Sequence, residues 1–122
     1  MTNHTASHHM NAEIEKCIHN CEECHDVCIQ TMSYCLQMGG KHAKPSHIRL
    51  LEDCIQICHT SADFMLRGSQ LHHRICGVCA EICEQCAADC EKVDSNDTQM
   101  MACAEVCRRC AESCHQMERM AA

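Results

Sequence analysis

The chain has 122 residues, which suits one compact domain, and its 17 acidic and 10 basic side chains give a formal net charge of −7. The acidic balance, with no tryptophan, one tyrosine and one phenylalanine, argues against nucleic-acid binding. No apolar run is long enough to cross a bilayer and no secretion signal opens the chain, so we expect a cytoplasmic protein without membrane contact.

Glycine and proline are rare, and where they occur they separate four segments with helical periodicity. Residues 1–10 are expected to form a flexible, His-rich tail, and residues 11–122 a single domain. The expected helices cover about residues 11–38, 46–67, 70–93 and 97–119. Because the connections are short, successive helices run antiparallel, and the sequence predicts an all-α, up-down-up-down four-helix bundle.

Three polar residues are expected to cap these helices. Asn11 precedes the first helix, and Ser46 opens the second. Asn96, with Gln99 three residues later, resembles a capping box before the fourth helix.

Cysteines recur at steps of three and four residues along these segments, and such steps return to one side of a helix. Leucine and isoleucine fill this stripe in most bundles. Here cysteine is expected to line the core, because a free thiol behaves as a small buried hydrophobe. The candidate metal ligands are Cys17, Cys21, Cys24, Cys28, Cys35, Cys54, Cys58, Cys76, Cys79, Cys83, Cys86, Cys90, Cys103, Cys107, Cys110 and Cys114.

The stripes also predict how the helices face one another. Folding the third helix back on the fourth gives four cysteine layers in one register. The pairs are Cys90 with Cys103, Cys86 with Cys107, Cys83 with Cys110 and Cys79 with Cys114. The first two helices match less closely, in a register that places Cys28 beside Cys58 and Met32 beside Cys54.

Thiols in such numbers on rigid helices favour metal binding over disulfides. Neighbouring stripe cysteines have Cβ atoms about 5–6 Å apart, beyond the distance of a good disulfide. Zinc takes four thiolates per ion, and several such dianionic units would bury a large negative charge. The cysteine run of bacterial ferredoxins is absent from the sequence, which argues against an iron–sulfur cluster.

Cu(I) fits these thiols best, because it is a soft ion that selects thiolate and thioether ligands. With a metal–sulfur bond of about 2.3 Å, a linear S–Cu–S unit spans roughly 4.6 Å, close to the spacing of side chains at i and i+4. The C-x3-C pairs lie at 17/21, 24/28, 54/58, 79/83, 86/90, 103/107 and 110/114. If each thiolate bridges two ions, multiple Cu(I) ions approach one per cysteine and neutralise the thiolates.

A four-helix bundle lined by C-x3-C pairs resembles the bacterial copper storage proteins. The resemblance rests on segments such as CIHNCEECHDVC, CGVCAEICEQC and CAEVCRRCAESC, and it covers the chain after the tail. It implies cytosolic storage and detoxification of Cu(I) in a core that holds many ions, and assembly into tetramers. The second helix has only Cys54 and Cys58, so the side of the core that it forms is expected to bind less metal than the others.

Two other functions compete with storage. A zinc-binding thiolate scaffold would bind about one ion per four cysteines, and a copper chaperone would bind one or two ions at an exposed site. No Ser/His/Asp set or carboxylate pair stands out, and the C-x2-C pairs lie inside helical repeats without a surrounding βαβ unit. We therefore do not expect an enzyme.

The end of the bundle where the first helix begins is the expected entrance for copper. Thioethers are neutral and weaker ligands than thiolates, which suits a site that passes copper inward. The residues expected there are Met10, Met65, His72, His73 and Met117. The opposite end is a competing entrance, with Met38, His42, His47 and Met100.

An apolar strip on the second helix is expected either to pack against a neighbouring helix of the bundle or to mediate self-association. Leu50, Ile57 and Phe64 recur at seven-residue spacing, to one side of the cysteine stripe. An outward apolar strip on a small domain usually meets a partner. Together with the family resemblance, it favours a homo-oligomer, a tetramer.

Overall fold

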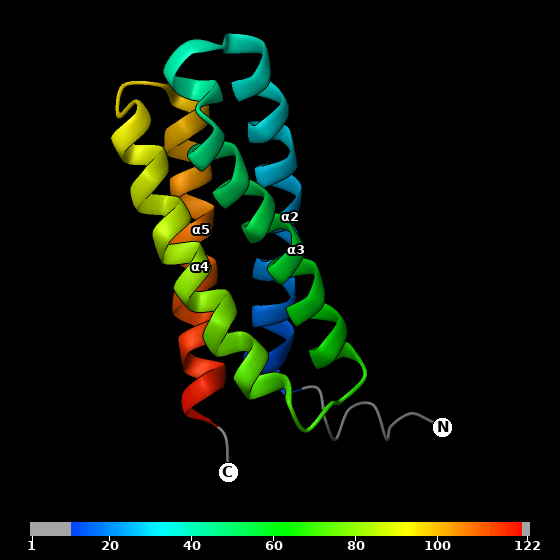
Figure 1. Cartoon of the computed structure of the whole chain (residues 1–122). Coiled ribbons are helices and arrows are strands. Elements are labelled where there is room, and N and C mark those ends of the chain that lie inside the picture. Colours follow the sequence, from blue (N-terminus) through cyan, green and yellow to red (C-terminus); the bar gives the residue numbers. More distant parts are fainter. Residues whose placement is uncertain (1–10, 121–122) are drawn as a thin grey trace.

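The computed structural model describes residues 11–120, and within them the chain folds into four long helices and one short 3-10 helix (Figure 1). The elements are α2 (Ala12–Met38), η1 (Gly40–Ala43), α3 (Pro45–Leu66), α4 (His72–Val93) and α5 (Thr98–Arg119). Successive long helices run antiparallel, so the predicted all-α four-helix bundle is confirmed. The expected tail, residues 1–10, lies outside the described residues.

Each long helix packs against two others: α2 against α3 and α5, and α4 against α3 and α5. The bundle therefore has two distinct ends (Figure 1). We call the end with residues 39–44 and the α4–α5 turn, residues 94–97, the loop end. We call the opposite end, with Asn11, the α3–α4 turn at residues 67–71 and Met120, the terminal end.

The first two helices begin differently. Asn11 caps α2 as predicted, because its side-chain oxygen accepts a hydrogen bond from the Ile14 amide at 2.9 Å. The prediction that Ser46 caps α3 is wrong. Pro45 is already helical, as proline favours at the first position of a helix, so Ser46 lies inside the first turn and Lys44 precedes the helix without a side-chain cap.

The cap of α5 is Asp97, one residue after the predicted Asn96. The Asp97 carboxylate accepts a hydrogen bond from the Met100 amide at 3.1 Å, and its charge favours the positive end of the helix. Gln99 does not close a capping box. Its side-chain amide donates to the Thr31 hydroxyl at 2.9 Å and so ties α5 to α2.

Sulfur makes up most of the core. Every cysteine is at most 1% exposed, and all sixteen are free. The larger side chains buried with them are Leu51, Met65, Met100 and Met117. Alanines seven residues apart, Ala80 and Ala87 on α4 and Ala104 and Ala111 on α5, are also buried, and such small residues let neighbouring helices approach closely.

The register of α4 and α5 is the predicted one, whereas that of α2 and α3 is not. Cys54 lies against Cys24, with 3.8 Å between the sulfurs, where the sequence predicts Met32. The sulfur of Cys58 lies within 4.8 Å of that of Cys24, where the sequence predicts Cys28. The reason is η1, because the connection centred on it moves the point where the chain reverses towards the end of α2.

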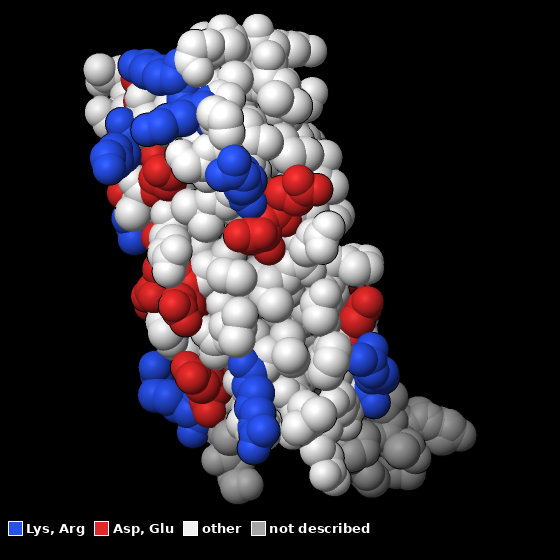
Figure 2. Space-filling model, in the orientation of Figure 1, with Lys and Arg blue, Asp and Glu red and all other residues white. Residues whose placement is uncertain are grey.

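Charged side chains lie on the outside of the bundle. On the face in Figure 2, basic side chains gather towards both ends and acidic ones lie mainly between them. Among the residues that the structure describes, no helix has the length and apolarity needed to cross a membrane.

Candidate metal centre

The four helices aim all of the predicted cysteine ligands into one column of thiols along the bundle axis. This follows from the stripes, since steps of three and four keep each row of sulfurs on the inward side of its helix. The closest contacts join Cys17 and Cys21 to Cys114 (each 3.6 Å), Cys24 and Cys28 to Cys107 (each 3.7 Å), and Cys54 and Cys58 to Cys83 (each 3.7 Å). A thiol of one helix thus faces a C-x3-C pair of its neighbour.

The sulfurs of these triangles lie closer together than the linear geometry expected from the sequence requires. The sulfurs of Cys24 and Cys28 are 4.0 Å apart and those of Cys79 and Cys83 are 3.9 Å apart, less than the roughly 4.6 Å of a linear unit. Three sulfurs around one ion at about 2.3 Å are roughly 4.0 Å from one another. The thiols therefore stand at the spacing of three-coordinate sites.

The thiols also form overlapping groups of four, in which all sulfurs lie within 4.8 Å of one another. One group contains Cys24, Cys28, Cys54 and Cys107, and another Cys24, Cys54, Cys58 and Cys83. Because Cys24 and Cys54 belong to both groups, the groups cannot each hold a separate tetrahedral ion with its own four ligands. The arrangement favours a continuous cluster with bridging thiolates.

Two thiols of the metal-free column, Cys35 and Cys86, have raised pKa values that keep them protonated at neutral pH. Removal from water raises the pKa of Cys35 to about 11. The pKa of Cys86 is also raised to about 11, first by its contact with the thiol of Cys103. A metal ion must therefore replace protons when it enters.

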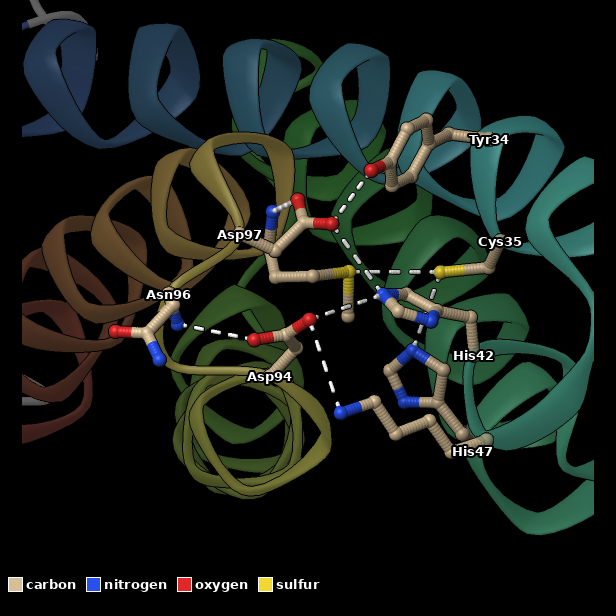
Figure 3. A network of polar contacts seen from close by, with 9 residues as sticks. Tyr34, Cys35, His42, His47, Asp94, Asn96 and Asp97 are labelled. Carbon is tan, nitrogen blue, oxygen red and sulfur yellow. Dashed lines mark hydrogen bonds and ion pairs between the residues drawn. The ribbon is translucent and has the colours of Figure 1, made fainter.

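At the loop end the column finishes in a set of mixed donors (Figure 3). Cys35 Sγ lies 3.5 Å from His47 Nε2 and 3.5 Å from Met100 Sδ. Asp89 Oδ2 is 2.6 Å from His47 Nδ1, which orients the imidazole so that Nε2 faces the sulfurs. All three donor residues are buried.

The sequence places Met100 at the start of the cysteine stripe of the fourth helix but assigns His47 only to a competing entrance, although a signal for its place in the column exists. His47 lies seven residues before Cys54, and Met100 seven before Cys107, so each continues a cysteine stripe by one heptad. Extending the stripes to other copper-binding side chains finds both.

At the terminal end, the predicted entrance residues lie in two settings. Met65 and Met117 are buried in the core. His72 and His73 are half-buried, with ring centres 6.2 Å apart, and His72 Nδ1 is 2.8 Å from the carbonyl oxygen of Ser69. Met10 lies outside the described residues.

Comparisons with known proteins identify what this chain is similar to. The family model described as "Copper storage protein" matches residues 10–119. The crystal structure of Nmul_A1745 from Nitrosospira multiformis is 41% identical, with a TM-score of 0.85 over 91% of this chain and 99% of that one. The Cu(I)-bound copper storage protein BsCsp3 is 35% identical, with a TM-score of 0.81 over 87% and 98% of the two chains. The uncharacterized cysteine-rich protein YhjQ of Bacillus subtilis is 37% identical over 88 residues, which are 72% of this chain and 82% of that protein.

The raised thiol pKa values predict an alkaline loss of stability in the metal-free protein. Cys35 keeps its proton up to about pH 11 when folded, whereas the ordinary value is 9.0. Its contribution to stability is therefore complete below about pH 9 and declines as the pH rises towards 11, because the unfolded chain loses the proton first. Anaerobic urea unfolding, followed by circular dichroism at a series of pH values, measures this decline.

Titration of the ultraviolet thiolate absorbance supplies the matching control. The folded protein should form thiolates at a higher pH than the same protein in urea. Thiolates that appear at the same pH in both samples would contradict the prediction.

Proposed function

We propose that this chain binds many Cu(I) ions through the thiolates of its core and holds them in store. The chain belongs to the copper storage protein family, whose model covers residues 10–119. The observation that carries the proposal is the unbroken column of sixteen buried, free thiols that share neighbours along its length. The role of this family is storage rather than catalysis.

All sixteen cysteines are proposed as ligands, at close to one Cu(I) per cysteine. Each C-x3-C pair with a facing thiol, such as Cys24, Cys28 and Cys107, offers three soft donors at the spacing of a copper site. Charge supports the same ratio, because one Cu⁺ per thiolate leaves the dry core neutral. His47 and Met100 complete the ligands of Cys35 at the loop end.

The alternatives fit the geometry less well. A zinc scaffold needs separate sets of four thiolates, whereas the observed sets share members. A copper chaperone needs an exposed site for transfer, whereas every cysteine is buried. Sixteen free thiols also favour the reducing cytoplasm as the location of the protein.

We propose that copper enters at the terminal end. At the loop end, η1 connects α2 to α3, and Tyr34 and His42 contact Asp97 in the α4–α5 turn, so the helices are linked across this end of the bundle. Among residues 11–120, the α3–α4 turn is the one connection between helices at the terminal end, where α2 also begins and α5 also ends (Figure 1). Met65 and Met117 there are placed to pass Cu(I) to the thiols.

A tetramer is proposed from the apolar strip on α3. Leu50, Ile57 and Phe64 remain partly exposed after the bundle has formed, although Leu50 and Ile57 also pack on the core. A strip of this kind is available to a second copy of the chain.

Anaerobic titration of the reduced protein with Cu(I) should end near one ion per cysteine. Protons are released as thiols become thiolates, so loading should weaken as the pH falls below neutral. Metal analysis after gel filtration gives the capacity, and a pH indicator gives the protons. One or two copper ions per chain would indicate a chaperone, and one zinc per four cysteines a zinc scaffold.

Replacing Met65 and Met117 by leucine tests the entrance. Leucine keeps the volume and removes the thioether, so Cu(I) uptake from a chelator should slow several-fold while the final capacity stays the same. The matched control is Met38→Leu with Met101→Leu, which removes two exposed thioethers that are not among the proposed ligands. Slower uptake only in the control pair would place the entrance at the loop end instead.

Sedimentation velocity tests the tetramer and the strip together. Sedimentation of the wild-type protein should give a molar mass four times that of the monomer, as its resemblance to the copper storage proteins implies. Leu50→Glu with Phe64→Glu should give monomers or dimers of unchanged helix content, because charge on the strip opposes burial. Ile29→Glu, on the exposed surface of α2, is the control and should leave the mass unchanged.

A further inference from the structure

His42 is a buried imidazole at the loop end whose Nε2 atom has no hydrogen-bond partner. Only 4% of the residue is exposed, and Nε2 is fully shielded from solvent. The atom points between two carboxylates of the α4–α5 turn, 3.3 Å from Asp97 Oδ2 and 3.8 Å from Asp94 Oδ2 (Figure 3). A buried polar atom without a partner is rare and calls for a physical reason.

The distances from His42 Nε2 to the two carboxylate oxygens resemble those between ligands of one metal ion. Zn²⁺ binds imidazole nitrogen and carboxylate oxygen at about 2.0–2.2 Å. Ligands at that distance in a tetrahedral shell lie roughly 3.3–3.6 Å from one another. The 3.3 Å distance from His42 Nε2 to Asp97 Oδ2 falls in this range, and the 3.8 Å distance to Asp94 Oδ2 lies slightly above it.

The geometry points to a Zn²⁺ site formed by His42 Nε2, Asp94 Oδ2 and Asp97 Oδ2, with water as the fourth ligand. Two carboxylates balance the charge of the ion, and neutral imidazole suits zinc. The site is separate from the thiol column in donor type, since oxygen and nitrogen donors do not select Cu(I) over harder ions.

Both carboxylates are already oriented by other hydrogen bonds. The Tyr34 hydroxyl donates to Asp97 Oδ2 at 2.5 Å, and this bond, the largest of several causes, lowers the pKa of Asp97 so that it stays ionised. The Asn96 amide donates to Asp94 Oδ1 at 3.1 Å and leaves Oδ2 free to face His42. Outer hydrogen bonds of this kind commonly fix the ligands of a metal site.

Lys41 is the other charged side chain at the site. Its Nζ lies 3.8 Å from Asp94 Oδ2, but the side chain is 65% exposed, so it can turn into solvent when a cation binds. A bound ion would join η1 to the α4–α5 turn above Cys35 and Met100, and would thereby hold the loop end shut.

Equilibrium dialysis of Cu(I)-loaded protein against Zn²⁺ tests this site, because bound copper occupies the thiols that would otherwise take zinc. Metal analysis should find one retained Zn²⁺ per chain. His42→Gln and Asp94→Asn should lose it, and Tyr34→Phe, which removes only an outer hydrogen bond, should bind about tenfold more weakly or worse. His59→Gln is the matched control, because His59 pairs with Asp63 on the exposed surface of α3 and should retain zinc like wild type.

The copper count of each sample reports on storage separately from the zinc count. Full copper with no zinc in wild type would overturn the zinc site while leaving storage intact, and would mean that His42 forms only an ion pair with the two carboxylates. Equal zinc in wild type and His42→Gln would also overturn it, because the ion would then lie elsewhere.

Circular dichroism of each variant shows whether the fold is kept. Should a variant unfold, a rise in the wild-type thermal midpoint with Zn²⁺ that is absent in Tyr34→Phe supports the site, and no rise in wild type overturns it.

Discussion

The packing of sulfur against sulfur in the bundle core is the constraint on which the rest of the structure depends. A four-helix bundle ordinarily gains its stability from branched aliphatic side chains. Here Leu51 is the one leucine that is fully buried among the described residues, and thiols in van der Waals contact take the place of the others. Because a thiol is small, the helices must lie close together, which the buried alanines of α4 and α5 allow. The short distance between helices in turn sets the sulfur spacing that suits copper.

Because the packed thiols exclude water, an isolated charge in the column is energetically unfavourable. The thiol of Cys35 holds its proton at neutral pH until a cation replaces it, because burial raises its pKa to about 11. Protein folding and metal binding therefore make opposite demands on each cysteine, a neutral group in one state and an anion in the other. A singly charged ion satisfies both, because each Cu⁺ that enters cancels the charge of the thiolate it creates. A divalent ion bound by four thiolates leaves a net negative charge in the core.

Much of the fold could be predicted from the sequence because its signals are local and periodic. The α4–α5 register follows from cysteines that match over the whole length of both helices. The α2–α3 register does not, since α3 has only Cys54 and Cys58 to align, and a short 3-10 turn shifts the point of reversal. The pairing of Asp97 with Tyr34 and His42 joins residues distant in sequence, through side chains with no periodic pattern, and only the folded chain brings them together.

The metal-binding side chains differ between the two ends of the bundle. Along the axis the donors are thiols, and at the loop end they change to thiol, thioether and imidazole around Cys35, then to imidazole and carboxylate around His42. This order runs from soft to hard donors over the space between α2 and the α4–α5 turn. The soft donors favour Cu(I), and the imidazole and carboxylates around His42 suit the divalent ion proposed above. At the terminal end Met65 and Met117 extend the soft donors instead, in keeping with the entrance proposed there.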